Sequence, residues 1–245
     1  MERGNETLSP AEAESLVSWW ADAGVDVSVQ DAPRDWLNEK PAAQAAAPLA
    51  APGPPDAADD SLPAQLDLFR AWLASSENLP FSAPNTPRVC PAGDPSSGLM
   101  IVADMPSGED CSAGTLMSGE VGALFDNMLK AIGRDRETIY LTALSCIRSP
   151  SGQINSQAAQ RCAGLARHHI GLAAPRAVLL FGDACAKALL GLPVAQARGR
   201  WHEIATHAGP VKALATIGPK QLLDGPRLKA LAWADLQMLI EEVNG

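Results

Sequence analysis

The run Leu99-Met100-Ile101-Val102-Ala103 decides the fold, because an unbroken apolar stretch here ends directly in the polar loop Asp104-Met105-Pro106-Ser107-Gly108. Such a run is typical of a strand that is buried on both faces. Three later runs share this character: residues 138–144, 177–181 and 211–217. Helices are predicted between and after the strands: residues 120–132, 156–172, 183–190 and 226–243. The alternation predicts an α/β fold, a three-layer α/β/α sandwich with a central four-stranded parallel sheet.

Charge and composition set the N-terminal part of the chain apart. Acidic residues outnumber basic ones by 14 to 4 in residues 1–84, whereas residues 85–245 carry 14 acidic and 15 basic residues. We expect an acidic N-terminal helical segment at 1–39, a linker rich in Ala and Pro at 40–63, and the α/β domain at 64–245. A nucleic-acid backbone would repel the acidic segment, so we do not expect that segment to bind DNA itself.

The composition excludes several classes of protein. Apolar residues form 47% of the 245 residues, which is enough for a buried core and too much for a disordered chain. No run approaches the ~18 apolar residues of a membrane span, and the first residues lack the basic and apolar segments of a signal peptide. The five cysteines are an odd number, which fits a reducing compartment better than a disulfide framework. The expected location is therefore cytoplasmic.

Candidate chemistry lies in the loops that follow the strands, because ligands of an open parallel sheet bind beyond the carboxyl ends of its strands. These loops are expected to begin at Asp104, Ala143, Gly182 and Gly218. Asp104 would lie at the tip of the first strand, where rigid backbone holds a carboxylate in place. An ordinary strand-to-helix connection without chemistry is the competing interpretation of this loop.

The cysteines and glycines form no cofactor motif by spacing. The cysteines lie at positions 90, 111, 146, 162 and 185, so no C-x-x-C pair exists, and buried structural thiols are the simpler interpretation. The sequence also has neither a Walker A motif nor a G-x-G-x-x-G motif, which leaves nucleotide cofactors weakly supported.

Several segments carry recognisable motifs in the order of the chain. They are IVADMPSGED (101–110), GTLMSGEVG (114–122), IYLTA (139–143), LFGDACAKALLG (180–191), RGRWHE (198–203), and TIGPKQLL (216–223) followed by Lys229 and Trp233-Ala234-Asp235-Leu236. Together these segments resemble the uracil-DNA glycosylase superfamily, most closely its iron–sulfur type, family 4, over residues 88–242. The resemblance implies the superfamily's fold and hydrolysis of the N-glycosidic bond of a uracil that has left the DNA stack.

The resemblance also implies roles for individual residues. Asp104 stands where the family has its catalytic Glu, and Met117 stands where it has the Phe that stacks on the base. Ala143 replaces the base-reading Asn, and Gly218 replaces the His that donates to the departing base. The substrate-binding residues are then expected to be Met105, Pro106, Ser107, Met117, Ala143, Gly218 and Pro219. The residues expected to contact DNA phosphates are Arg198, Arg200 and Lys220.

The family's iron–sulfur cluster is expected to be absent from this chain. Only Cys162, and less clearly Cys146, match positions of cluster ligands, and residues 80–87 contain no cysteine. A cluster with four cysteine ligands therefore cannot form, and we expect no metal and no other cofactor.

Two functions from different classes follow, with a third of broader kind. The first is a base-excision glycosylase, weak or altered in its choice of base, that acts on single- or double-stranded DNA. The second is a catalytically impaired relative that binds DNA or a repair protein, with Trp19-Trp20 of the acidic N-terminal helix as a docking element. The third is an α/β domain that binds another small molecule. A monomer is expected in each case.

Overall fold

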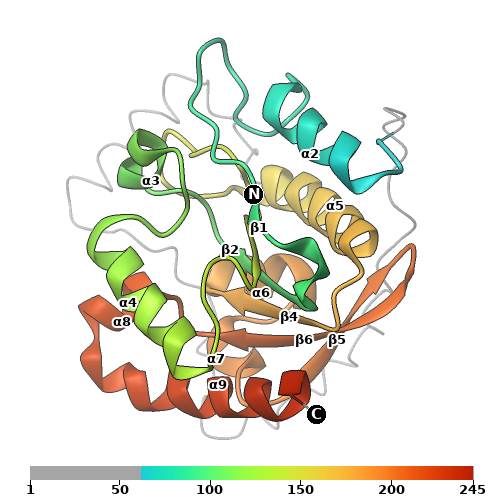
Figure 1. Ribbon diagram of the computed structural model, residues 1–245. Helices are drawn as coiled ribbons and strands as arrows, with labels where there is room; N and C mark the ends of the chain where they lie inside the picture. Colours follow the sequence, from blue (N-terminus) through green and yellow to red (C-terminus); the bar gives the residue numbers. More distant parts are fainter. Residues whose placement is uncertain (1–61, 245) are drawn as a thin grey trace, which may run out of the picture. The chain divides into compact units, whose positions relative to one another are not determined.

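The structure, a computed structural model, describes residues 62–244. Its centre is a six-stranded sheet with the strand order β1-β3-β2-β4-β6-β5 (Figure 1). The strands are β1 (Ala92–Gly93), β2 (Leu99–Ala103), β3 (Tyr140–Ala143), β4 (Ala177–Phe181), β5 (Trp201–Thr206) and β6 (Gly209–Thr216). The predicted acidic segment at 1–39 and nearly all of the predicted linker at 40–63 lie outside the described residues.

The four central strands confirm the predicted parallel core. β3, β2, β4 and β6 pair in parallel, in register from Val102 with Thr142 to Phe181 with Thr216. β1 and β5 add antiparallel pairs at the two edges, so the described sheet is mixed and larger than the predicted four-stranded one. Neither edge strand contains an apolar run: β1 has two residues, and only Ile204 of β5 is buried.

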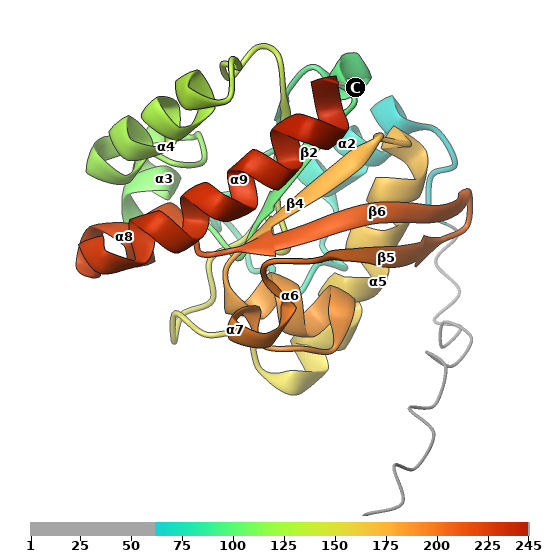
Figure 2. The same cartoon turned by 90° about the horizontal axis from the view of Figure 1, so that it is seen from below.

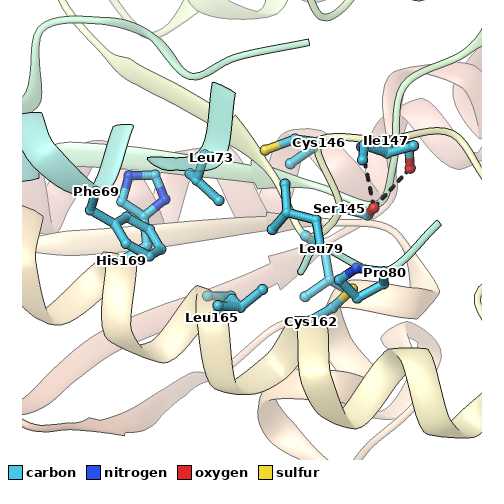
Figure 3. Close-up of a pocket in the computed structure, with 13 residues that line it drawn as sticks. Phe69, Leu73, Leu79, Pro80, Ser145, Cys146, Ile147, Cys162, Leu165 and His169 are labelled. Atoms are coloured by element: carbon cyan, nitrogen blue, oxygen red, sulfur yellow. Dashed lines mark hydrogen bonds between the residues drawn. The ribbon is translucent and has the colours of Figure 1, made fainter. Parts of the chain in front are cut away.

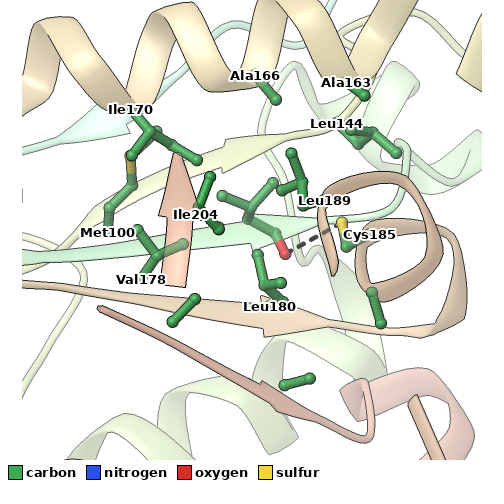
Figure 4. Close-up of a cluster of buried hydrophobic side chains, with 14 of the residues drawn as sticks. Met100, Leu144, Ala163, Ala166, Ile170, Val178, Leu180, Cys185, Leu189 and Ile204 are labelled. Carbon is green, nitrogen blue, oxygen red and sulfur yellow. Dashed lines mark hydrogen bonds between the residues drawn. The ribbon is translucent and has the colours of Figure 1, made fainter. Parts of the chain in front are cut away.

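Helices cover both faces of the sheet. They are α4 (Gly119–Ala131), α5 (Ser156–Ala173), α6 (Asp183–Leu190), α7 (Val194–Ala197), α8 (Pro219–Asp224) and α9 (Lys229–Asn244). Helices α5, α6 and α7 pack on the face that buries Met100, Val178 and Leu180 (Figure 4). Helices α4 and α9 pack on the opposite face, over Ile101 and Leu179 (Figure 2). Side chains of successive strand residues point to opposite faces, so each face buries its own set of residues under its own helices. The predicted α/β/α layers are therefore confirmed.

Two further helices lie outside these layers. α2 (Leu66–Ser75) packs against the outer side of α5 through Phe69 and Leu73, and α3 (Gly108–Ala113) follows the loop after β2. The short helices α3, α7 and α8 were not predicted, because six residues or fewer are too short to display helical periodicity. No helix among residues 62–244 has the length and apolar character to cross a membrane.

A buried polar pair lies beneath α2. The hydroxyl of Tyr140 in β3 and Nε2 of His169 in α5 are 2.8 Å apart, and both residues are almost fully buried. Burial lowers the pKa of His169 to about 3, and the neighbouring Arg70 and His168 act in the same direction. His169 is therefore neutral in the folded protein at any pH near neutrality.

This pair makes the fold sensitive to acid. The folded pKa of His169 lies below the ordinary value of 6.5, so between these two values the unfolded chain binds a proton and the folded chain does not. The free energy of unfolding therefore decreases as the pH falls from 6.5 toward 3. At pH 5 the loss from this one group is about 2 kcal/mol. Urea unfolding of wild type and His169→Gln at pH 7.5 and pH 5 measures it. The difference in unfolding free energy between pH 7.5 and pH 5 should be smaller in His169→Gln than in wild type, and it should be unchanged in the exposed-site control His207→Gln. An equal decrease in both variants would contradict this assignment.

Candidate active site

The carboxyl ends of the parallel strands form one edge, and the predicted loops meet there. The N–H of Leu144 donates to the carbonyl of Ala103 at 2.7 Å, which extends the pairing of β2 and β3 into their loops. On the other side, the N–H of Gly182 donates to the carbonyl of Thr216 at 3.2 Å, which joins the ends of β4 and β6. The loops that start at Asp104, Ala143, Gly182 and Gly218 are therefore neighbours, as the topology predicts.

Asp104 is turned inward at the tip of β2. Its Oδ1 accepts the backbone N–H of Cys185 at 2.7 Å, in the first turn of α6, where unpaired N–H groups favour a negative charge. Burial raises the pKa of the Asp104 carboxyl above its usual range, while the N–H groups of Cys185 and Ala184 oppose that rise. The site therefore holds a carboxylate that is poorly solvated but supported by a helix N-terminus.

Gly182 lies against this carboxyl group, and Gly218 lies beside Gly182. Gly182 has φ of +100°, and a Cβ atom there would overlap the carboxyl group of Asp104. A glycine is thus required at the end of β4. Gly218 differs, because a Cβ atom there would meet the nitrogen of Gly182 at 3.8 Å, an ordinary contact. Position 218 therefore has room for a Cβ atom, so contacts at that atom do not require a glycine there.

The loop after β2 is joined to the loop that carries Met117. Asp110, which is 6% exposed, accepts the N–H of Ser107 at 2.9 Å and the N–H of Ser118 at 2.7 Å. Ser107 in turn caps α3 by accepting the N–H of Asp110 at 3.0 Å. One buried carboxylate therefore fixes Met105-Pro106-Ser107 relative to Met117. Asp110 is not among the predicted site residues, although its place three residues after Ser107 is the spacing of a capping box.

Met117 and Ala143 belong to the same side of the edge. Ala143 is buried at the end of β3, and the partly buried Met117 packs on the apolar cluster that contains Ala143 and Phe181. Pro219 is buried as the first residue of α8, directly after Gly218. The structure thus brings the predicted substrate-binding residues to one edge of the sheet, in loops that contact one another.

The three predicted DNA-binding cations differ in their surroundings. Arg198 donates from Nε and Nη2 to the two carboxyl oxygens of Asp235 at 3.1 and 3.0 Å. Asp235 is fully buried and also accepts the hydroxyl of Thr216 at 2.7 Å, so the geometry favours a structural role for Arg198 rather than a phosphate contact. Arg200 and Lys220 are exposed, and Lys220 lies in the first turn of α8 beside the site.

Arg148 is a cation that sequence reasoning missed. It is exposed in the loop after β3, and its Nη1 donates to the carbonyl of Pro106 at 3.2 Å. Arg148 therefore connects two loops of the candidate site while leaving other guanidinium donors at the surface. Its signal in the sequence is its place just beyond a buried strand, at the edge where ligands bind.

The surroundings of Cys146 and Cys162 do not fit an iron–sulfur cluster. Both thiols line a cavity of about 20 Å³, room for about one water molecule and not for a cluster of iron and sulfur atoms. The other walls are mainly apolar, and Figure 3 shows Leu73, Leu79 and Pro80 facing the two cysteines. Burial raises the pKa of Cys146 to about 12 and that of Cys162 to about 11, so both are neutral thiols when no metal is bound. Within residues 62–244 no group of three or more His, Cys, Asp or Glu side chains is arranged to hold a metal ion.

Comparisons with known proteins show the family to which the chain belongs. The family model described as the uracil DNA glycosylase superfamily matches residues 90–237, and the chain belongs to this superfamily. A Type-4 uracil-DNA glycosylase of Pyrobaculum aerophilum is 26% identical over 153 residues, which cover 60% of this chain and 78% of that protein. A Type-4 uracil-DNA glycosylase of Archaeoglobus fulgidus is 21% identical over 156 residues, which cover 61% of this chain and 78% of that protein.

The cavity predicts a protein that folds without iron. Protein purified anaerobically from iron-supplemented cells should contain far less than one iron atom per chain and lack the visible absorbance of a cluster. Metal analysis and absorbance spectra check this, with Cys162→Ser as the matched variant. Iron in cluster amounts that disappears in Cys162→Ser would contradict the expected absence of a cluster.

Proposed function

We propose that this protein is a DNA glycosylase of base excision repair that hydrolyses the N-glycosidic bond of an extruded, damaged base, with Asp104 as its catalytic carboxylate. The observation that carries the proposal is the partly buried carboxyl group of Asp104, supported by the first turn of α6 at the edge where the site loops meet. Membership of the superfamily supports the type of reaction.

Asp104 can serve the reaction in its ionised form. As the glycosidic bond breaks, the sugar gains positive charge, which a fixed carboxylate in a poorly solvated site stabilises strongly. The same carboxylate can orient the water that attacks the sugar. The hydrogen bond from Cys185 fixes the carboxyl group before the substrate arrives, so little reorganisation is needed during the reaction.

The lost side chains point to slow or less selective excision. A donor to the departing base is typically worth about 10²–10³ in rate, and Gly218 supplies none from a side chain. A base-reading amide is worth roughly 1–3 kcal/mol of discrimination, and Ala143 supplies none. Met117 can lie against a base but presents a flexible thioether in place of a ring. We therefore propose an altered choice of base, with uracil and deaminated purines as candidates.

DNA is the proposed partner. Lys220, Arg200 and Arg148 are exposed cations. Arg148 lies in a site loop and Lys220 in the first turn of α8, where they suit contacts to phosphates near an extruded nucleotide. A monomer that works in the cytoplasm is part of the proposal, as is a repair protein that docks on the predicted acidic N-terminal helix.

The alternative function is a catalytically impaired relative that binds DNA or a repair partner. Ala143 and Gly218 favour it, because both lack the polar groups through which a pocket recognises a base. Under this alternative Asp104 only supports the first turn of α6.

A strand-cleavage assay separates the two functions. Single- and double-stranded oligonucleotides that contain uracil, hypoxanthine or xanthine are incubated with the protein and tested for alkali-labile sites. Asp104→Asn should lower the excision rate about 10²-fold or more, because the charge is lost while the size is kept. Asp224→Asn, the same change at an exposed position in α8, should leave the rate unchanged.

Other outcomes decide against the proposal. Excision by Asp104→Asn at the wild-type rate would remove Asp104 from the reaction. Wild-type protein that cleaves no substrate, yet binds DNA with an affinity that falls steeply with salt, would favour the alternative.

A further inference from the structure

Met117 has an unusual backbone for its residue type. Its φ is +55°, in the left-handed region that residues with a side chain seldom occupy. A residue held in such a conformation is over-determined by its surroundings, and this is often a mark of function. The surroundings of Met117 therefore identify the groups that hold it.

Arg136 contacts this part of the backbone directly. Its Nη1 donates to the carbonyl of Leu116 at 2.9 Å, and its Nη2 donates to the carbonyl of Met117 at 2.6 Å. Its Nε donates to Asp126 in α4 at 2.6 Å, and the guanidinium lies 5.2 Å from the ring centre of Phe125. The guanidinium is thus fixed on α4 and presents a rigid fork to two consecutive carbonyls, a geometry that a lysine cannot reproduce.

The other side of the loop is equally constrained. Asp110 accepts the N–H of Ser118, directly after Met117. A Cβ atom at Gly122 would overlap the carbonyl of Met117 and lie 3.1 Å from Nη2 of Arg136, so only glycine lets this carbonyl approach α4. Figure 1 shows α3 and α4 on either side of the loop. The loop is therefore held from both sides, and the direction of the Met117 side chain is set.

We propose that Arg136 is a positioning residue that fixes Met117 as one wall of the base pocket. This inference rests on the proposed function, because Met117 has a base to contact only if a base enters the site. Arg136 itself lies behind the loop and acts through the backbone of Leu116 and Met117. Without its fork, the carbonyls lose their donors and the loop is free to leave the left-handed conformation.

Methyl NMR of the full-length chain tests the positioning. The chain contains six methionines, so labelled methyl groups give few resonances, and Met117→Leu identifies the one that belongs to Met117. Arg136→Gln should move that resonance toward the value of a freely rotating side chain, and Arg136→Lys should move it part of the way. Arg134→Gln, the same loss of charge two residues away, should leave it unchanged. An unaltered Met117 resonance in Arg136→Gln would overturn the inference.

A double-mutant cycle links the position to the reaction. Arg136→Gln should lower single-turnover excision about 10- to 100-fold when Met117 is present and have little effect in a Met117→Ala background. An equal loss in both backgrounds would mean that Arg136 acts on general stability, which overturns the inference. If the wild-type protein cleaves no substrate, the proposed function is contradicted, and the inferred pocket wall with it. If the wild-type protein cleaves and Arg136→Gln cleaves at the same rate, only this inference is contradicted.

Discussion

The site depends on one hydrogen bond, from the backbone N–H of Cys185 to the carboxylate of Asp104. It joins the tip of β2 to the first turn of α6 and fixes the position of the Asp104 carboxyl group. The required glycine at 182 follows from it, because the carboxyl group occupies the space of a side chain there. The N–H of Gly182 donates to the carbonyl of Thr216, which joins the end of β6 to the same place. A buried charge of this kind persists because helix N–H groups replace part of its lost hydration.

Other buried charges organise the loops around this centre in a similar way. Asp110 holds the backbone of the two loops on the side of β2, and Asp235 holds Thr216 and Arg198 beneath the loop after β6. Asp110 is paired with donors on both sides of α3, and Asp235 with donors 19 and 37 residues away, which fixes loops that carry little apolar surface of their own. The region around Cys146 and Cys162 differs, because it is held mainly by apolar packing against α2 and not by buried carboxylates.

The sequence allowed the central sheet to be predicted because its strands are buried on both faces. β2 and β4 match the predicted residues 99–103 and 177–181, whereas β5, in which only Ile204 is buried, gave no signal. The position of Asp104 at a strand tip was also predictable. Its partner Cys185 lies 81 residues away, and Asp235 lies 37 residues from Arg198, so these pairings depend on tertiary structure. Arg198 was expected to contact DNA because its pairing with Asp235 cannot be read from the sequence.

The most direct test of this account is the stability of Asp104→Asn relative to wild type as a function of pH. Because the folded pKa of Asp104 is raised above its usual 3.8, ionisation favours the unfolded chain, and wild type should lose stability relative to the neutral Asn variant as the pH rises above 3.8. Urea unfolding of both proteins between about pH 4 and pH 8 measures the difference. The free energy of unfolding of Asp104→Asn should rise relative to that of wild type as the pH rises. A relative fall instead would show that the carboxylate is an ordinary stabilising cap and not a desolvated catalytic group.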